Sequence, residues 1–145
     1  MNPKPRELDC ACLALRQAAR MVTQFYGAEL RGRLEIPQFG LLSVLDRRSG
    51  CNQAGLAREL NLDKTTLSRN LKLMEENGWI EHTLSDDRRE RGYRLTASGK
   101  KLLQAARPAW KRAQARFQAA MGGRWEAMWE LLDEIEMAVG SARNS

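Results

Sequence analysis

The chain has 145 residues, of which 43% are hydrophobic and 29% are charged, and its formal net charge is +6. This balance is typical of one globular domain with an apolar core and excludes a disordered chain. No apolar run approaches the roughly 20 residues that a membrane span needs. The first ten residues have no apolar segment like that of a secretion signal, so we expect the protein in the cytoplasm, with its three cysteines as thiols.

Two helices are predicted in the first third of the chain. Over residues 8–34, apolar residues recur at three- and four-residue spacing with polar residues between them, which indicates an amphipathic helix. Pro37 is suited to open a second helix, because the first turn of a helix tolerates proline. That helix is strongly apolar, and the sequence Arg-Arg-Ser-Gly at 47–50 ends it.

The next two predicted helices are short and are separated by a tight turn. Asn52 is a suitable N-cap for a helix over 53–60, because its side chain can accept from a free backbone N–H. After a turn at 61–63, another helix is expected over 64–77, and Gly78 fits the position that follows a helix C-terminus. Its buried face consists of the apolar residues at i, i+4 and i+7: Leu67, Leu71 and Met74.

A β-hairpin is expected after these helices. Residues 79–84 and 92–95 are rich in β-prone residues, and the segment between them is short and highly charged. Thr96 then caps a long helix over about 97–121, in which Pro108 is expected to cause an interruption with a kink.

The last predicted helix, about 124–139, has a wide apolar stripe, made of Trp125, Met128, Trp129, Leu132, Ile135 and Val139. This is more apolar surface than a lone helix can bury, so we expect the stripe to be buried. It packs either on residues 8–34 of the same chain or in a dimer interface shared with that helix, and we favour the dimer.

Two short helices, a tight turn and a charged hairpin occur in the order found in a winged helix-turn-helix. The second helix must bury one face and can offer the other to a DNA major groove, which is wide enough to admit a helix. The exposed side chains of its N-terminal part can bond phosphates or base edges, and no acid occurs there until Glu75. The candidate major-groove residues are Lys64, Thr65, Thr66, Ser68, Arg69 and Lys72.

The charged hairpin loop is predicted to be the wing. Arginine suits the narrow and negative minor groove, and acids beside it can hold the planar guanidinium in place before DNA binds. The Asp-x-Arg pattern can be read as Asp86 with Arg88 or as Asp87 with Arg89, and Arg91 is a third candidate for the wing tip.

The segment from Gln53 to Gly99 resembles the winged-helix domain of MarR-type transcriptional regulators. The most specific element is the Asp-x-Arg wing followed by Leu95-Thr96-Ala97-Ser98-Gly99. The exit from the second helix, Leu73-Met74-Glu75-Glu76-Asn77-Gly78-Trp79-Ile80, also matches the pattern of these regulators. The resemblance implies a mainly α fold with a small β-hairpin: one domain over 1–145, with a winged helix-turn-helix over about 37–96. Helices over about 8–34 and 97–141 would form a homodimer.

The same resemblance implies a repressor that binds a palindromic operator in double-stranded DNA. It also implies release by a small aromatic ligand or by cysteine oxidation. An apolar ligand would fit between the dimerisation helices and the winged domain, near Phe25, Tyr26, Phe39 and Leu42. Oxidation would act on Cys10 or Cys12, with a bridge to Cys51 or across the dimer; the alternative is that these cysteines are small packing residues.

No catalytic function is indicated by the sequence. It contains no phosphate-binding glycine loop, no pair of catalytic carboxylates and no nucleophile motif, so we expect neither an enzyme nor a cofactor. A metal site is not expected, because His82 is the only histidine and no second cysteine pair is present. The alternative function is a winged-helix module that binds a partner protein and does not read DNA.

Overall fold

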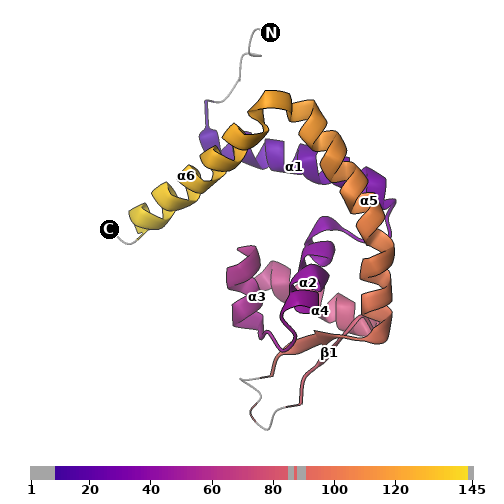
Figure 1. The fold of residues 1–145 in the computed structure, drawn as a ribbon. Coiled ribbons are helices and arrows are strands. Elements are labelled where there is room, and N and C mark those ends of the chain that lie inside the picture. The colour runs from indigo at the N-terminus through magenta and orange to yellow at the C-terminus, as the bar shows by residue number, and fades with distance from the viewer. Residues whose placement is uncertain (1–8, 85–86, 88–90, 144–145) are drawn as a thin grey trace. The chain divides into compact units, whose positions relative to one another are not determined.

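The structure, a computed structural model, describes residues 9–84, 87 and 91–143. Two compact units are present, residues 1–110 and 111–145. Among the described residues, none of the helices is sufficiently long and apolar to cross a membrane. The elements in chain order are α1 (Ala11–Leu30), α2 (Ile36–Arg47), α3 (Gln53–Leu60), α4 (Lys64–Glu76), β1 (Ile80–His82), β2 (Tyr93–Leu95), α5 (Ala97–Met121), the 3-10 turn η1 (Gly122–Arg124) and α6 (Trp125–Arg143) (Figure 1).

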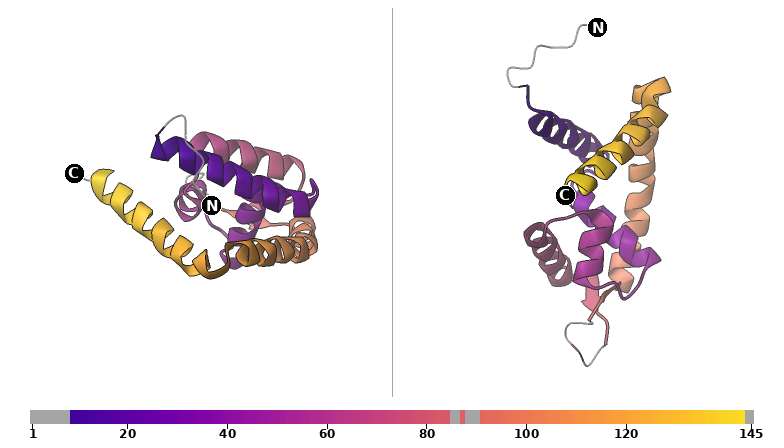
Figure 2. Two further views of the ribbon diagram at one scale, coloured as in Figure 1. Left: turned by 90° about the horizontal axis from the view of Figure 1, so that it is seen from above. Right: turned by 90° about the vertical axis from the view of Figure 1, so that its left-hand side faces the viewer.

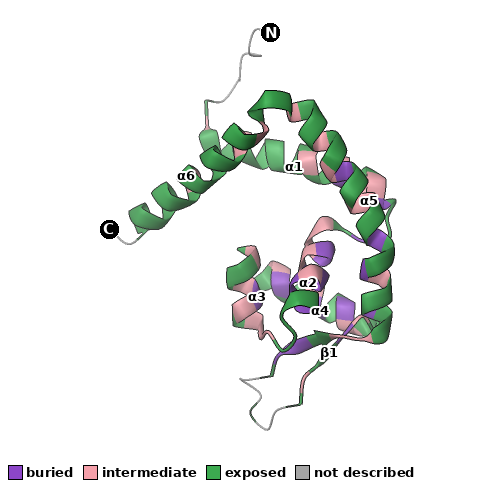
Figure 3. Cartoon of the chain, viewed as in Figure 1, coloured by how far each residue is buried: buried purple, intermediate pink, exposed green. Residues whose placement is uncertain are grey.

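The core of the first unit lies mainly between α2 and α4. Leu41 and Leu42 of α2 are fully buried, as are Leu67 and Met74 of α4, and Leu103 of α5 packs in the same cluster. Figure 3 shows this concentration of buried residues along α2, α4 and the first turns of α5. The buried residues of α4 are the three that the spacing predicts, so its opposite face is available for other contacts.

Polar caps define where the helices of this unit begin. The Asn52 Oδ1 atom accepts from the Gly55 N–H at 2.9 Å, which confirms the predicted cap of α3. Helix α2 begins with a capping box that the sequence did not reveal: Glu35 and Gln38 each accept from the other's backbone N–H. After the C-terminal end of α4, Gly78 has φ +72°, the left-handed conformation that glycine adopts readily.

The hairpin is antiparallel and pairs Ile80 with Leu95, Glu81 with Arg94 and His82 with Tyr93. A further bridge joins Tyr93 to Cys51, which lies in the connection between α2 and α3. In Figure 1 and in the right-hand view of Figure 2, the hairpin lies at one end of the group formed by α2, α3 and α4. The predicted strands are therefore confirmed, each somewhat shorter than expected.

Helix α5 is continuous through Pro108, so the expected interruption at this proline is wrong. Proline removes a single backbone hydrogen bond, and the helix extends for more than two turns on both sides of it. The fold class is otherwise as predicted: mainly helical with one two-stranded hairpin.

In the second unit, Phe117 packs edge-to-face on Trp125 at 5.7 Å, and Trp125 packs in the same way on Trp129 at 5.6 Å. No residue of α6 is buried in the single chain, so the expected burial of its apolar stripe in a dimer stays a prediction. Trp129 is 46% exposed and Val139 is 53% exposed. Figure 3 shows α6 as exposed along most of its length.

Candidate nucleic-acid interface

Helix α4 begins at Asp63, whose carboxylate is engaged twice by one residue. Its Oδ1 atom accepts from the Thr66 N–H at 2.9 Å, and its Oδ2 atom accepts from the Thr66 hydroxyl at 2.6 Å. These bonds stabilise the charged carboxylate and lower the pKa of Asp63, the hydroxyl contributing most. The start of the candidate recognition helix is thus fixed by a cap of two hydrogen bonds.

Five of the predicted major-groove residues are exposed and lie on one face of α4. At about 100° per residue their side chains fall within an arc of roughly 140°, on the side away from the buried leucines. Lys72 also lies 4.0 Å from Glu76, at the next turn of the helix. These five residues are Lys64, Thr65, Ser68, Arg69 and Lys72.

Thr66, the sixth predicted residue, is placed differently. It is half-buried at the border of the exposed face, and its hydroxyl proton is donated to Asp63. The neighbouring Asn70 is also turned to the helix, since its side-chain amide donates to the Thr66 carbonyl at 3.1 Å. A contact from Thr66 to DNA remains a prediction, and the hydroxyl could act in it only as an acceptor.

Gln53, at the start of α3, is a residue of this interface that the sequence did not single out. Its side-chain nitrogen donates to the Ser68 hydroxyl oxygen at 2.7 Å and so joins α3 to the exposed face of α4. The only sequence signal was its place directly after the Asn52 cap, in the first turn of α3.

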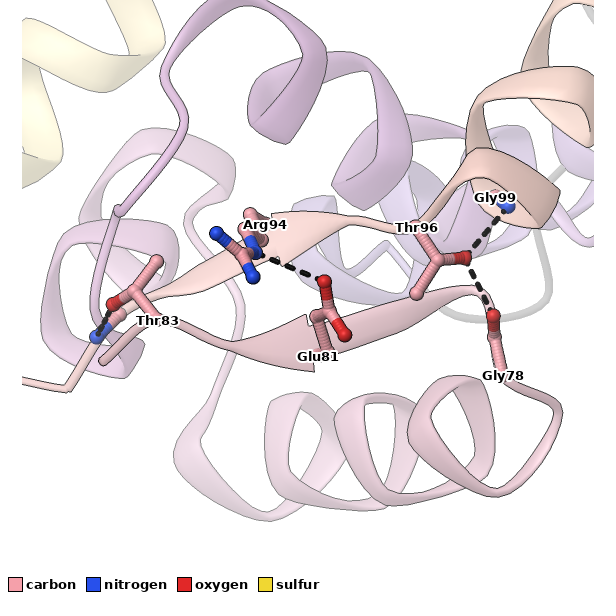
Figure 4. A network of polar contacts seen from close by, with 7 residues as sticks. Gly78, Glu81, Thr83, Arg94, Thr96 and Gly99 are labelled. Carbon is pink, nitrogen blue, oxygen red and sulfur yellow. Dashed lines mark hydrogen bonds and ion pairs between the residues drawn. The ribbon is translucent and has the colours of Figure 1, made fainter.

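The strands of the wing are held by paired polar contacts, which Figure 4 shows. Arg94 donates its Nε–H to Glu81 across the hairpin at 2.9 Å. Where the strands separate, the Gly92 N–H donates to the Thr83 hydroxyl at 3.0 Å. Of the predicted wing residues, Asp87 and Arg91 are exposed, whereas Asp86, Arg88 and Arg89 lie outside the described residues.

At its base, the wing is joined to two helices by the hydroxyl of Thr96. This hydroxyl donates to the Gly78 carbonyl at 2.6 Å and accepts from the Gly99 N–H at 3.0 Å (Figure 4). It therefore caps α5, as predicted, and also holds the residue that follows α4. A Cβ atom at Gly99 would lie 1.9 Å from the Trp79 carbonyl oxygen, so only glycine fits there.

A second junction connects α4 directly to the two strands. His82 of β1 lies 3.1 Å from the Glu75 carboxylate, and its ring packs against that of Tyr93 at 4.5 Å between centroids. Burial raises the pKa of Tyr93, and the charge of Glu75 and a hydrogen bond to it raise that pKa further. Recognition helix and wing are thus linked through side chains as well as through the backbone.

The four residues of the candidate effector site are largely engaged in packing. Leu42 is fully buried, and Phe39 stacks on Trp110 with 5.6 Å between ring centroids. Phe25 and Tyr26 contact each other edge-to-face at 6.2 Å, and burial raises the pKa of Tyr26. Phe39 and Leu42 belong to the core cluster, in which neither Phe25 nor Tyr26 takes part.

All three cysteines are free thiols. Cys10 is half-buried and is the N-cap residue of α1, Cys12 is exposed in the first turn, and Cys51 is half-buried beside the wing. Within the described part of the chain, no group of three or more histidine, cysteine or acidic side chains is arranged to hold a metal ion.

Comparison with known proteins identifies relatives among transcriptional regulators. Residues 34–90 match the family model described as MarR family. The protein YwoH of Bacillus subtilis (strain 168), called an uncharacterised HTH-type transcriptional regulator, is 28% identical over 88 residues, which are 60% of this chain. This chain spans 64% of the length of YwoH.

Two solved structures resemble nearly the whole chain. The transcriptional regulator MosR of M. tuberculosis, solved in complex with DNA, is 32% identical, with 93% of this chain and 99% of that chain covered and a TM-score of 0.82. The transcriptional repressor CouR, bound to a 23-mer DNA duplex, is 26% identical with the same coverage and a TM-score of 0.78.

The order of α3, α4 and the hairpin, with an exposed basic face on α4, defines a winged helix-turn-helix regulator. The chain belongs to the MarR family of transcriptional regulators. The members of this family are DNA-binding regulators and not enzymes, which confirms the corresponding prediction.

Proposed function

We propose that this regulator is a homodimeric repressor that binds a palindromic operator in duplex DNA. The exposed face of α4 enters the major groove, and arginines of the wing enter the adjacent minor groove. The observation that carries this proposal is the composition of the α4 face, on which five donor-bearing side chains lie together and no acid occurs before Glu75. Thr66 contributes at the border of this face, and Asp86 and Asp87 orient Arg88, Arg89 and Arg91.

The known complexes support this mode of binding. MosR and CouR have each been solved with DNA, and each is similar to this chain over more than nine-tenths of its length. A protein-interaction module would have no need for a basic recognition face next to an arginine-rich wing, so we rank that alternative second.

The exposed apolar residues outside the DNA-binding lobe support a dimer. Leu13 and Met21 of α1 are 51% and 62% exposed, and Trp129 and Leu132 of α6 are 46% and 40% exposed. Side chains of this kind are usually covered by a partner. In this proposal the segments 8–34 and 97–141 dimerise within one domain of residues 1–145. The two-fold axis then places the α4 helices roughly 34 Å apart, one turn of DNA.

Two triggers for release remain in the proposal, and both act in the cytoplasm. One is a small aromatic ligand bound near Phe25, Tyr26, Phe39 and Leu42; CouR has been solved with p-coumaroyl-CoA. The other is oxidation at Cys10 or Cys12, of which the latter thiol is exposed. A Cys10→Ser, Cys12→Ser variant separates them: an undiminished response to peroxide in this variant excludes control by these thiols.

The proposal is tested by fluorescence anisotropy with duplex DNA from upstream of the protein's own gene, at two salt concentrations. We expect tight binding that weakens with salt, because each phosphate contact contributes about 0.9 to the slope of log affinity against log salt. A triple variant, Arg88→Ala, Arg89→Ala, Arg91→Ala, should bind more weakly and with a smaller slope.

A matched control removes three charges elsewhere, at the exposed Arg33, Lys111 and Arg124. This triple alanine variant should retain most of the affinity. Equal binding to a scrambled duplex would show that the operator lies elsewhere, and absence of binding at low salt would favour the protein-interaction alternative.

A further inference from the structure

The hydrogen bond between Gln53 and Ser68 sets the polarity of one side chain on the DNA-binding face. Gln53 is half-buried at the first turn of α3, and Ser68 is exposed near the middle of α4. The Gln53 Nε2 atom donates to the Ser68 Oγ atom at 2.7 Å. The serine is thus the acceptor in this contact.

A serine hydroxyl has one proton to donate and two lone pairs that accept. In other helices of this chain the proton is used by the backbone: Thr23 donates to the Ala19 carbonyl at 2.8 Å, and Ser43 donates to the Phe39 carbonyl at 2.7 Å. Ser68 accepts from Gln53 instead. With that lone pair occupied, its proton can be donated outward, to a group in front of α4.

We propose that Gln53 is a specificity-determining residue: it orients Ser68 as a hydrogen-bond donor, which selects against cytosine in the operator. In the major groove, guanine O6 and N7, adenine N7 and thymine O4 accept hydrogen bonds, whereas cytosine presents only the N4 donor. Ser68 therefore disfavours cytosine on the strand that it faces. This inference rests on the proposed placement of α4 in the major groove.

The neighbours of Ser68 make it the suitable side chain for this selection. The Thr66 hydroxyl proton is donated to Asp63, and one of the two Asn70 amide protons is donated to the Thr66 carbonyl. Lys64, Arg69 and Lys72 are cations, which can bind phosphates as well as the guanine edge. Ser68 is neutral and oriented by a second helix, and neutral groups contribute to selectivity mainly through hydrogen-bond direction.

The inference predicts that reversing the Gln53 hydrogen bond reverses the base preference. In Gln53→Glu the carboxylate can only accept, so it takes the Ser68 proton and leaves only lone pairs facing the DNA. The added charge weakens binding to all sequences alike, because it repels phosphates. Relative base preference is insensitive to such a uniform loss, so it is the quantity to measure.

The experiment is selection from a randomised duplex library followed by sequencing, with the full-length wild type, Gln53→Glu, Gln53→Leu and Ser68→Ala. The wild type should disfavour cytosine at one position of each half-site by about fivefold, the ratio expected for one hydrogen bond. Gln53→Glu should shift that position towards cytosine and away from guanine and thymine, which offer no major-groove donor, and Gln53→Leu and Ser68→Ala should each remove the preference there. All other positions should be unchanged.

The double variant Gln53→Leu, Ser68→Ala keeps the test decisive if Gln53→Glu does not fold. Because both residues act through one contact, the double variant should lose no more selectivity than Ser68→Ala alone. An unchanged preference in Gln53→Glu or in Ser68→Ala overturns the inference while leaving the proposed function intact. A wild-type protein that enriches no sequence overturns the proposed function and the inference together.

Discussion

The imidazole of His82 lies 3.1 Å from the carboxylate of Glu75, and this contact joins β1 of the wing to the last turn of α4. The charge of the same carboxylate and a hydrogen bond to it add to the effect of burial in raising the pKa of Tyr93, which lies on the partner strand. One acidic side chain of the recognition helix therefore contacts both strands of the wing, in addition to the contacts of Thr96 at its base.

Replacing Glu75 by alanine should weaken DNA binding several-fold by loosening the wing. Both groups of the pair are partly solvent-exposed, so the change in unfolding free energy should be only about 0.5 kcal/mol. Anisotropy with operator DNA measures the first effect and urea denaturation the second. In the background of the triple variant Arg88→Ala, Arg89→Ala, Arg91→Ala, the Glu75→Ala substitution should cause no further loss of DNA affinity. An additive loss would show that Glu75 affects DNA binding by a route other than the wing.

The neighbouring Glu76→Ala variant is the control for this prediction. Within the described part of the chain, Glu76 forms its ion pair with the exposed Lys72, at 4.0 Å. Its removal should leave the wing in place and should not reduce DNA affinity.

The ionisation of Tyr93 should occur above the ordinary pKa of 10.0, because burial and the Glu75 charge disfavour the phenolate. Below pH 10 the tyrosine is neutral in both folded and unfolded states. As the pH rises above 10, the unfolded state ionises first, so the unfolding free energy should fall through this range. Tyrosine absorbance should show an earlier transition in Glu75→Gln, and Tyr93→Phe identifies the signal, since Tyr26 also has a raised pKa.

Replacing Gly99 by alanine should destabilise the first unit by about 2 kcal/mol or more, because the new Cβ atom would lie 1.9 Å from the Trp79 carbonyl oxygen. Thermal unfolding followed by circular dichroism measures this loss. Gly27→Ala is the matched control: no atom lies within 4 Å of its Cβ position in α1, so it should raise stability by about 0.5 kcal/mol. Equal stabilities of the two variants would contradict the close approach at Gly99.

Introducing a charge on the exposed face of α6 should produce monomers. Trp129→Lys would place a cation in an interface that we propose to be apolar, and its desolvation is unfavourable. Sedimentation equilibrium of the wild type and the variant measures the change. Leu84→Glu alters a residue that is 96% exposed in the wing, so this control should remain dimeric. A wild-type protein that is already monomeric at micromolar concentration would exclude the dimer.

Much of the DNA-binding lobe could be predicted from the sequence because local rules determine it. The period of Leu67, Leu71 and Met74 gave the buried face of α4, and Asn52 and Gly78 marked helix ends through their own chemistry. Such signals depend only on residues that are close in the sequence, so they can be recognised without a structure.

Contacts between elements could not be predicted in this way. The bond from Gln53 to Ser68 depends on the packing of two helices and on side-chain rotamers. Thr66 looked like its exposed neighbours in sequence, yet its hydroxyl is turned to the Asp63 cap. Pro108 was expected to interrupt α5, but the loss of one backbone hydrogen bond is small beside the many that remain in a 25-residue helix.

The bridge between Cys51 and Tyr93 has a consequence for aggregation. Tyr93 donates its N–H to the Cys51 carbonyl at 3.0 Å, and its own carbonyl accepts from the Gly50 N–H at 2.8 Å, while β2 pairs with β1 on its other side. The outer edge of β2 is therefore covered at Tyr93. This contact hinders a strand from another molecule from adding to this side of the hairpin, and covering an edge is a common way in which β-proteins avoid edge-to-edge association. The bare backbone of Gly92 makes this protection possible, because a Cβ atom there would lie 1.9 Å from the Gly50 oxygen and push the covering segment away.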